Sequence, residues 1–168
     1  MTDVIGITPV VSRRAPAASE PHELTLIELL FFAYRDFVSD PDALLTDYGF
    51  GRAHHRVLHF VNRHPGMTVA ELLDILRITK QSLGRVLKQL IDAGFVDQRP
   101  GPRDRRQRLL YVTPPGEALA RRLLDMQSRR IRAALEAVPP ELRPGAAAFL
   151  RGIIDGGERD KVARLLKG

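Results

Sequence analysis

The sequence predicts a mainly helical fold that carries one small β-hairpin. Apolar residues recur at spacings of three and four over most of the chain beyond residue 22, which is the period of a helix with one buried face. Two short segments, 95–99 and 107–113, are expected to be strands. Between them, Pro100-Gly101-Pro102 cannot continue a strand ladder and indicates the loop of a hairpin.

The N-terminal part is expected to contain an arm and two helices. Residues 1–21 hold three prolines and are interpreted as an arm. A first helix is predicted over 23–39 and is expected to end at Asp40-Pro41, because the residue before a proline is disfavoured in a helix. A second helix is predicted over 52–62, and Pro65-Gly66 stops it.

Two further helices follow with only a short link between them. Thr68, with Glu71 three residues later, forms a capping box that opens the third helix. Thr79 can cap a fourth helix, which is predicted over 80–93 and stops at Gly94. The order of helix, short turn, helix and hairpin therefore predicts a winged helix-turn-helix core, in which the hairpin is the wing.

The C-terminal part is predicted to be helical. A long helix is expected over 116–137, where Pro139-Pro140 ends it. Two shorter helical pieces are expected over 141–152 and 158–166. These pieces carry apolar residues that a monomer need not bury, namely Leu142, Phe149, Leu150, Ile153, Ile154, Val162, Leu165 and Leu166.

Composition limits the classes of function. The chain has 168 residues, with 26 Lys and Arg against 20 Asp and Glu, and a net charge of +6. This balance favours polyanionic partners. The absence of cysteine excludes disulfides, thiol catalysis and thiolate metal sites. No apolar run approaches the roughly 20 residues that a membrane helix needs, and no signal peptide is recognisable, so we expect a soluble, cytoplasmic protein.

The fourth helix and the hairpin together indicate DNA binding. The outward face of the helix is polar, as expected of a recognition helix that reads base edges in the major groove. The hairpin carries five arginines between residues 97 and 108, which can reach phosphates and a narrow minor groove. Asp104 could hold one of these arginines by a paired hydrogen bond. The candidate DNA-binding residues are Thr68, Thr79, Lys80, Gln81, Ser82, Arg85, Lys88, Arg99, Arg103, Asp104, Arg105 and Arg106.

Gly84 is unusual in the interior of the fourth helix, where glycine is unfavourable relative to alanine. Two explanations remain open from the sequence. The helix backbone could approach DNA closely at this position, or it could pack tightly against the preceding helix.

The segment from Thr68 to Gly116 resembles the winged helix-turn-helix core of the MarR family of bacterial transcription regulators. The wing pattern of that family is Asp-x-Arg, a strand, and then Leu-Thr-x-x-Gly. Here Asp104-Arg105-Arg106 matches the first part, and 112–116 matches the second with valine in place of leucine. The resemblance implies that Arg106 enters the minor groove and that Asp104 orients it.

The resemblance also implies partners and an organisation. It implies a homodimer, held by the first and last helices, that acts as a repressor on a pseudo-palindromic double-stranded DNA operator. The chain would comprise an arm (1–21), an N-terminal dimerisation helix and linker (22–50), a DNA-binding domain (51–116) and C-terminal dimerisation helices (117–168). An aromatic-acid-like effector would bind between the dimer helices and the DNA-binding lobe. Its candidate contacts are Phe32, Tyr34, Arg35, His55, Arg56 and His59.

Histidines gather in and after the second helix, and three interpretations of them stay open. His55 and His59 stand four residues apart, a spacing that can hold a metal. They could instead line a dimer or pocket surface, or sense pH or a ligand. We favour ordinary lining residues and predict neither a metal nor a cofactor.

Three other functions are alternatives to a sequence-specific regulator. A winged-helix protein–protein adaptor would more often expose apolar residues at these positions. A non-specific nucleoid-binding protein would lack a sequence preference. An enzyme is disfavoured, because the chain has no catalytic triad context, phosphate loop or dinucleotide fingerprint.

Overall fold

The computed structural model describes residues 22–167, so the predicted arm over residues 1–21 lies outside the described part. The chain divides into two units, 1–36 and 37–168. The first unit contributes the beginning of helix α1. The second contains the remainder of α1 and every other helix and strand described below.

The elements agree with the prediction apart from the end of the first helix, one additional strand and the start of the long fifth helix. The helices are α1 (His22–Thr46), α2 (Arg52–Arg63), α3 (Val69–Leu76), α4 (Lys80–Asp92), α5 (Pro114–Glu136), α6 (Arg143–Ile153) and α7 (Arg159–Lys167). The strands are β1 (Met67–Thr68), β2 (Val96–Pro100) and β3 (Arg108–Val112). Short 3-10 turns, Pro140–Leu142 and Gly156–Glu158, precede α6 and α7. Among the described residues, no helix is long and apolar enough to cross a membrane.

Helix α1 continues past Asp40-Pro41, so its predicted end was wrong. Pro41 lies inside the helix, where its ring removes one backbone hydrogen bond. The ring is fully buried, as is Leu45 one turn later. Burial of these two apolar groups offsets the missing hydrogen bond. This tertiary contribution is not visible in the local sequence.

The sheet has three antiparallel strands in the order β1-β3-β2, whereas two strands were predicted. The hairpin pairs Val96 with Val112 and continues to Pro100 opposite Arg108, so the first proline of the expected loop still belongs to β2. Strand β1 pairs Met67 with Leu110 along the other edge of β3. Two residues are too few to show the alternation of a strand, so sequence periodicity could not reveal β1.

The third difference is small and concerns the start of the long helix. Helix α5 begins at Pro114 rather than Gly116, because Thr113 is its N-cap and proline is favoured in the first turn. The side-chain oxygen of Thr113 accepts a hydrogen bond from the Gly116 backbone N–H at 3.2 Å. The predicted N-caps of α3 and α4 are confirmed. Thr68 accepts from the N–H of Glu71 with the full capping box, and Thr79 accepts from the N–H of Ser82.

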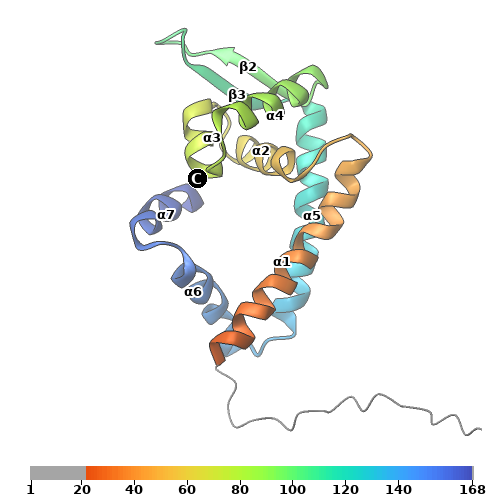
Figure 1. The fold of residues 1–168 in the computed structure, drawn as a ribbon, viewed down its shortest axis with the longest axis vertical. Coiled ribbons are helices and arrows are strands. Elements are labelled where there is room, and N and C mark those ends of the chain that lie inside the picture. The colour runs from red at the N-terminus through yellow and green to blue at the C-terminus, as the bar shows by residue number, and fades with distance from the viewer. Residues whose placement is uncertain (1–21, 168) are drawn as a thin grey trace, which may run out of the picture. The chain divides into compact units, whose positions relative to one another are not determined.

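The core of the second unit lies between α2, α3, α4, β3 and the first half of α5. The predicted apolar face of α2, formed by Val57, Leu58 and Val61, is fully buried. Leu83 and Leu90 of α4 are fully buried too. The core thus fixes which face of α4 remains outside. In Figure 1, the β2–β3 hairpin reaches past α3 and α4 at the end of the second unit where α5 begins.

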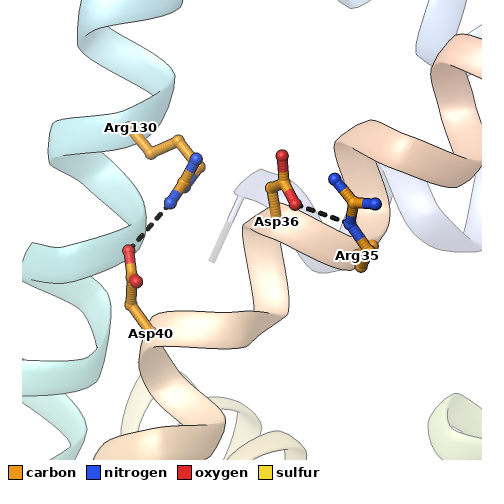
Figure 2. Close-up of polar contacts among 4 residues, drawn as sticks. All are labelled: Arg35, Asp36, Asp40 and Arg130. Atoms are coloured by element: carbon orange, nitrogen blue, oxygen red, sulfur yellow. Dashed lines mark hydrogen bonds and ion pairs between the residues drawn. The ribbon is translucent and has the colours of Figure 1, made fainter.

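An ion pair joins two long helices of this unit. Asp40, in the C-terminal half of α1, accepts a hydrogen bond from the Arg130 guanidinium of α5, with 2.9 Å between Oδ2 and Nη2 (Figure 2). Both side chains are largely exposed, so the pair contributes little to stability, of the order of 0–1 kcal/mol. It joins the C-terminal half of α1 to α5 within the second unit.

Candidate nucleic-acid interface

The outward face of α4 is polar and exposed along its whole length. Burial of Leu83, Val86, Leu87 and Leu90 turns this face away from the core. The predicted contacts Lys80, Gln81, Ser82, Arg85 and Lys88 are all exposed on it.

Several of the predicted contacts already have partners within the chain. The Thr79 hydroxyl donates to Ser82 Oγ at 2.8 Å, and the Lys88 ammonium pairs with Asp92 at 2.5 Å. The Thr68 hydroxyl donates to Glu71 Oε2 at 2.8 Å. Thr68, Thr79 and Ser82 therefore order the helix ends, whereas Lys80, Gln81 and Arg85 present exposed polar side chains on the first turns of α4.

The wing has an ordered base and a loop that folds back on itself. Arg99 lies over the Tyr111 ring, 4.5 Å from its centroid, and its guanidinium is 3.4 Å from Asp97 Oδ2. In the loop, the Gly101 N–H donates to the Gln107 carbonyl at 3.0 Å. A Cβ at Gly101 would lie 2.8 Å from the Asp104 carbonyl oxygen, so the loop closes too tightly for a side chain there.

Asp104 holds the backbone of the loop. Its Oδ1 accepts a hydrogen bond from the Arg106 backbone N–H at 2.9 Å. The sequence suggested a bond to an arginine side chain, and the structure instead shows a bond to the main chain. The carboxylate thereby fixes where the Arg106 side chain leaves the loop, and that guanidinium is exposed together with those of Arg103 and Arg105. The result is a concentrated positive charge on the wing, suited to phosphate or a narrow groove.

The Thr-x-x-Gly segment fastens the wing to α5. The Thr113 hydroxyl donates to the Gly94 carbonyl at 2.6 Å, and the Thr113 N–H donates to the Phe95 carbonyl at 3.1 Å. A Cβ at Gly116 would lie only 1.9 Å from the Phe95 carbonyl oxygen. Only glycine therefore allows the start of α5 to lie against the segment that leads from α4 into the wing.

His54 is a structural residue of this region that the sequence did not single out. It is the buried polar residue of the described core, and its ring stacks on Phe50 with centroids 4.7 Å apart. Nδ1 accepts from the Gly51 N–H at 3.1 Å, so the neutral ring carries its proton on Nε2, which donates to Gln89 Oε1 at 2.8 Å. His54 thus ties the start of α2 to α4. The sequence signal that could have identified this role is Gly51 followed three residues later by His54, which is the spacing of a capping box.

The predicted effector contacts lie in two units. Phe32, Tyr34 and Arg35 belong to the first unit and are exposed, with the Arg35 guanidinium 5.0 Å from the Phe32 centroid and paired with Asp36 (Figure 2). In the second unit, Arg56 donates to the Leu76 carbonyl at 3.1 Å, at the end of α3.

His55 and His59 are half-buried on α2 and favour the neutral form. Burial, and then the neighbouring His59, lower the pKa of His55, although Asp42 opposes the shift. Burial, followed by Arg63 and His64, lowers the pKa of His59. Within residues 22–167, no group of three or more His, Asp or Glu side chains is placed to hold a metal ion.

A cleft of about 670 Å³ opens between α3 and α7 in the second unit. Apolar side chains such as Phe60, Ile75 and Leu165 line it together with charged ones. Two ion pairs join its walls: Lys161 with Asp74, and the Arg77 guanidinium with Glu158 at 2.9 Å. None of the six predicted effector contacts lines this cleft, and their assignment stays a prediction.

The chain is similar to known transcription regulators over most of its length. A family model described as the MarR family matches residues 48–107. The HTH-type transcriptional regulator PetP of Rhodobacter capsulatus is 48% identical over 133 residues, which cover 79% of this chain and 80% of that protein.

Solved structures share the fold. FabT of Streptococcus pneumoniae, determined in complex with DNA, has a TM-score of 0.70 at 14% identity, over 78% of this chain and 94% of that one. MarR has a TM-score of 0.63 at 20% identity, over 92% of this chain and 99% of that one. At these identities the likeness concerns the fold, and the predicted fold class is confirmed.

Proposed function

Because the chain belongs to the MarR family of DNA-binding transcriptional regulators, which are not enzymes, we propose that it is a homodimeric, sequence-specific repressor. Its operator would be a pseudo-palindrome, and a small-molecule effector would release it. The observation that carries the proposal is the pairing of a polar recognition face on α4 with an arginine-rich wing in the same unit.

The two elements suit different parts of one duplex. Lys80, Gln81 and Arg85 stand on the first turns of α4, from which side chains can reach base edges and phosphates of the major groove. Arg106, fixed through Asp104, would enter the adjacent minor groove. The neighbour FabT, whose fold this chain shares, was solved with DNA bound. That complex supports the docking of this fold on a duplex.

Exposed apolar side chains on the C-terminal helices support a dimer. On α6, Phe149, Leu150 and Ile153 are between 46% and 55% exposed, and Leu166 of α7 is 58% exposed. A second copy of the chain would cover this surface, which we name the α6–α7 apolar surface. We propose residues 22–50 and 117–168 as dimerisation elements and 51–116 as the DNA-binding domain. Two-fold symmetry would then place two α4 helices about 34 Å apart, one helical turn of DNA.

The α3–α7 cleft is a second candidate site for an effector, separate from the six contacts predicted from the sequence. Lys161 and Arg77 join α7 to α3, and α3 leads directly into the turn before α4. An aromatic carboxylate in the cleft would compete with Asp74 and Glu158 for these cations while its ring lies among apolar side chains. Loss of the two ion pairs would free the helix-turn-helix from the C-terminal helices and alter the spacing of the two α4 helices.

Selection of bound sequences from a random duplex library, at near-physiological salt, tests the proposal. We expect enrichment of an inverted repeat whose half-sites are about one helical turn apart. Binding without enrichment would indicate a non-specific architectural protein. No binding by the effector-free chain would contradict the proposal and favour an adaptor.

A further inference from the structure

Gly84 is the fifth of the 13 residues of α4, and it lies on the exposed face of that helix. Glycine in a helix interior is destabilising relative to alanine. Two structural reasons commonly require it there. The backbone can have a positive φ, or a neighbouring group can lie too close for a Cβ.

Neither reason applies to Gly84. Its φ is not among the positive values found at Gly49, Gly66 and Gly94 in the described chain. A Cβ built on Gly84 would meet no heavy atom within 4 Å. Tight packing against the preceding helix, which the sequence left open, is therefore excluded. A methyl group at this position would point into open space, whereas one at Gly116 would strike the Phe95 carbonyl.

The chemistry of the exposed spot indicates what could occupy the space. In an α-helix the N–H of residue 84 donates to the carbonyl of residue 80, and its own carbonyl accepts from residue 88. The backbone at Gly84 consequently offers the exterior only its apolar Cα methylene. A phosphate or a polar base edge would need a donor or an acceptor there. The apolar group that base pairs present in the major groove is the 5-methyl group of thymine.

The neighbouring exposed positions on this helix face leave the spot open. Gln81 and Lys88, three residues before and four after Gly84, lie on the same helix face and are exposed. We call the bare helix surface at the Gly84 Cα, between these two positions, the Gly84 notch. Relative to alanine, glycine lacks one methyl group at the notch. A methyl group is also the difference between thymine and uracil.

We propose that the Gly84 notch seats the 5-methyl group of one thymine in each half-site, and so selects a T·A pair at that position. This inference rests on the proposed function, in which α4 enters the major groove. Gly84 would then be a specificity-determining residue that acts through the absence of a side chain.

The test compares the parent chain with Gly84→Ala on the duplex enriched by the selection. Each thymine is replaced in turn by deoxyuridine, which removes only the methyl group. On the thymine duplex, we expect Gly84→Ala to bind at least about tenfold more weakly than the parent. At one thymine per half-site, deoxyuridine should weaken the parent a few-fold and restore most of the affinity of Gly84→Ala. Thermal unfolding separates this effect from misfolding, because the variant should melt roughly 2–4 °C higher.

Each failure has a separate meaning. Equal binding of the parent and Gly84→Ala to the thymine duplex would overturn the inference alone. A loss that no deoxyuridine substitution restores would also overturn it, because the added methyl group would then not compete with a thymine methyl. A parent chain that enriches no sequence would overturn the proposed function and this inference together.

Discussion

The substitution Gly116→Ala should destabilise the protein, although it places alanine in a helix. The added Cβ would lie 1.9 Å from the Phe95 carbonyl oxygen, whereas Cβ contacts under 3.0 Å are essentially never seen. The oxygen belongs to the backbone and the backbone fixes the position of the Cβ, so no side-chain rotation can relieve the clash. The start of α5 must therefore move about 1 Å away from the segment that leads into the wing.

The size of the effect follows from the bonds that cross this contact. The Thr113 N–H bonds the Phe95 carbonyl at 3.1 Å, and the Thr113 hydroxyl bonds the Gly94 carbonyl at 2.6 Å. A displacement of this size breaks or weakens both, at about 0.5–1.5 kcal/mol each. Overpacking of this kind typically costs about 1–3 kcal/mol as a whole. The helix propensity of alanine returns up to about 1 kcal/mol. We expect a net loss of about 1–2 kcal/mol.

Urea denaturation measures this loss. With a slope of about 1–3 kcal/mol/M, the midpoint should fall by roughly 1 M. Gly84→Ala is the matched control, because the same change meets open space there and should raise the free energy of unfolding by up to about 1 kcal/mol. If Gly116→Ala unfolds at the same midpoint as the parent chain, the account of the Thr-x-x-Gly segment is refuted.

Four further predictions concern DNA, the dimer and pH. Arg106→Ala should weaken binding to the selected duplex while changing the free energy of unfolding by less than about 0.5 kcal/mol, because the side chain is exposed; unchanged affinity would remove Arg106 from the interface. Arg85→Ala should relax the preference at one base pair by about 1–3 kcal/mol in competition binding, and a uniform loss over all sequences would make it a phosphate contact. Leu150→Asp should lower the mass measured by light scattering from that of a dimer to that of a monomer. Helicity should be retained, since Leu150 is 55% exposed in the single chain. A dimer that persists would exclude the α6–α7 apolar surface as its main interface. The pKa values of His55 and His59 are lowered in the folded chain, so the unfolded chain binds more protons once the pH falls below about 6.5. The free energy of unfolding should therefore decrease between pH 7 and 5.5. A decrease of the same size in a variant with both His55 and His59 replaced by Gln would contradict this cause.

Local signals predicted most of the fold. The caps at Thr68 and Thr79 and the stop at Gly94 are set by hydrogen bonds and backbone angles within a few residues. Periodicity located the buried faces of α2 and α4 because each face meets the same core. By contrast, Pro41 is tolerated in α1 through burial, and β1 is a strand only because β3 lies beside it.

The site was predictable where its residues are consecutive. The outward face of α4 and the arginines of the wing follow from the order of residues in one helix and one loop. The bond from His54 to Gln89 joins positions 35 residues apart, and the α3–α7 cleft depends on the ion pair of Lys161 with Asp74. Contacts of this kind require the folded chain. For Gly84 the sequence left two explanations, and the open space around the helix removed one of them.

Hydroxyl-radical footprinting of the selected duplex tests DNA recognition by α4 and the wing together, because it locates both elements on the DNA at once. We expect two protected tracts related by a two-fold axis, about one helical turn apart, with minor-groove protection on their outer flanks. The Arg106→Ala variant is used at a protein concentration that restores full occupancy of the duplex. The protection of the outer flanks should then disappear, whereas the rest of the two tracts should stay protected. A single unsymmetrical tract would contradict a two-fold dimer on the DNA, and flanks that Arg106→Ala leaves protected would contradict the placement of the wing in the minor groove.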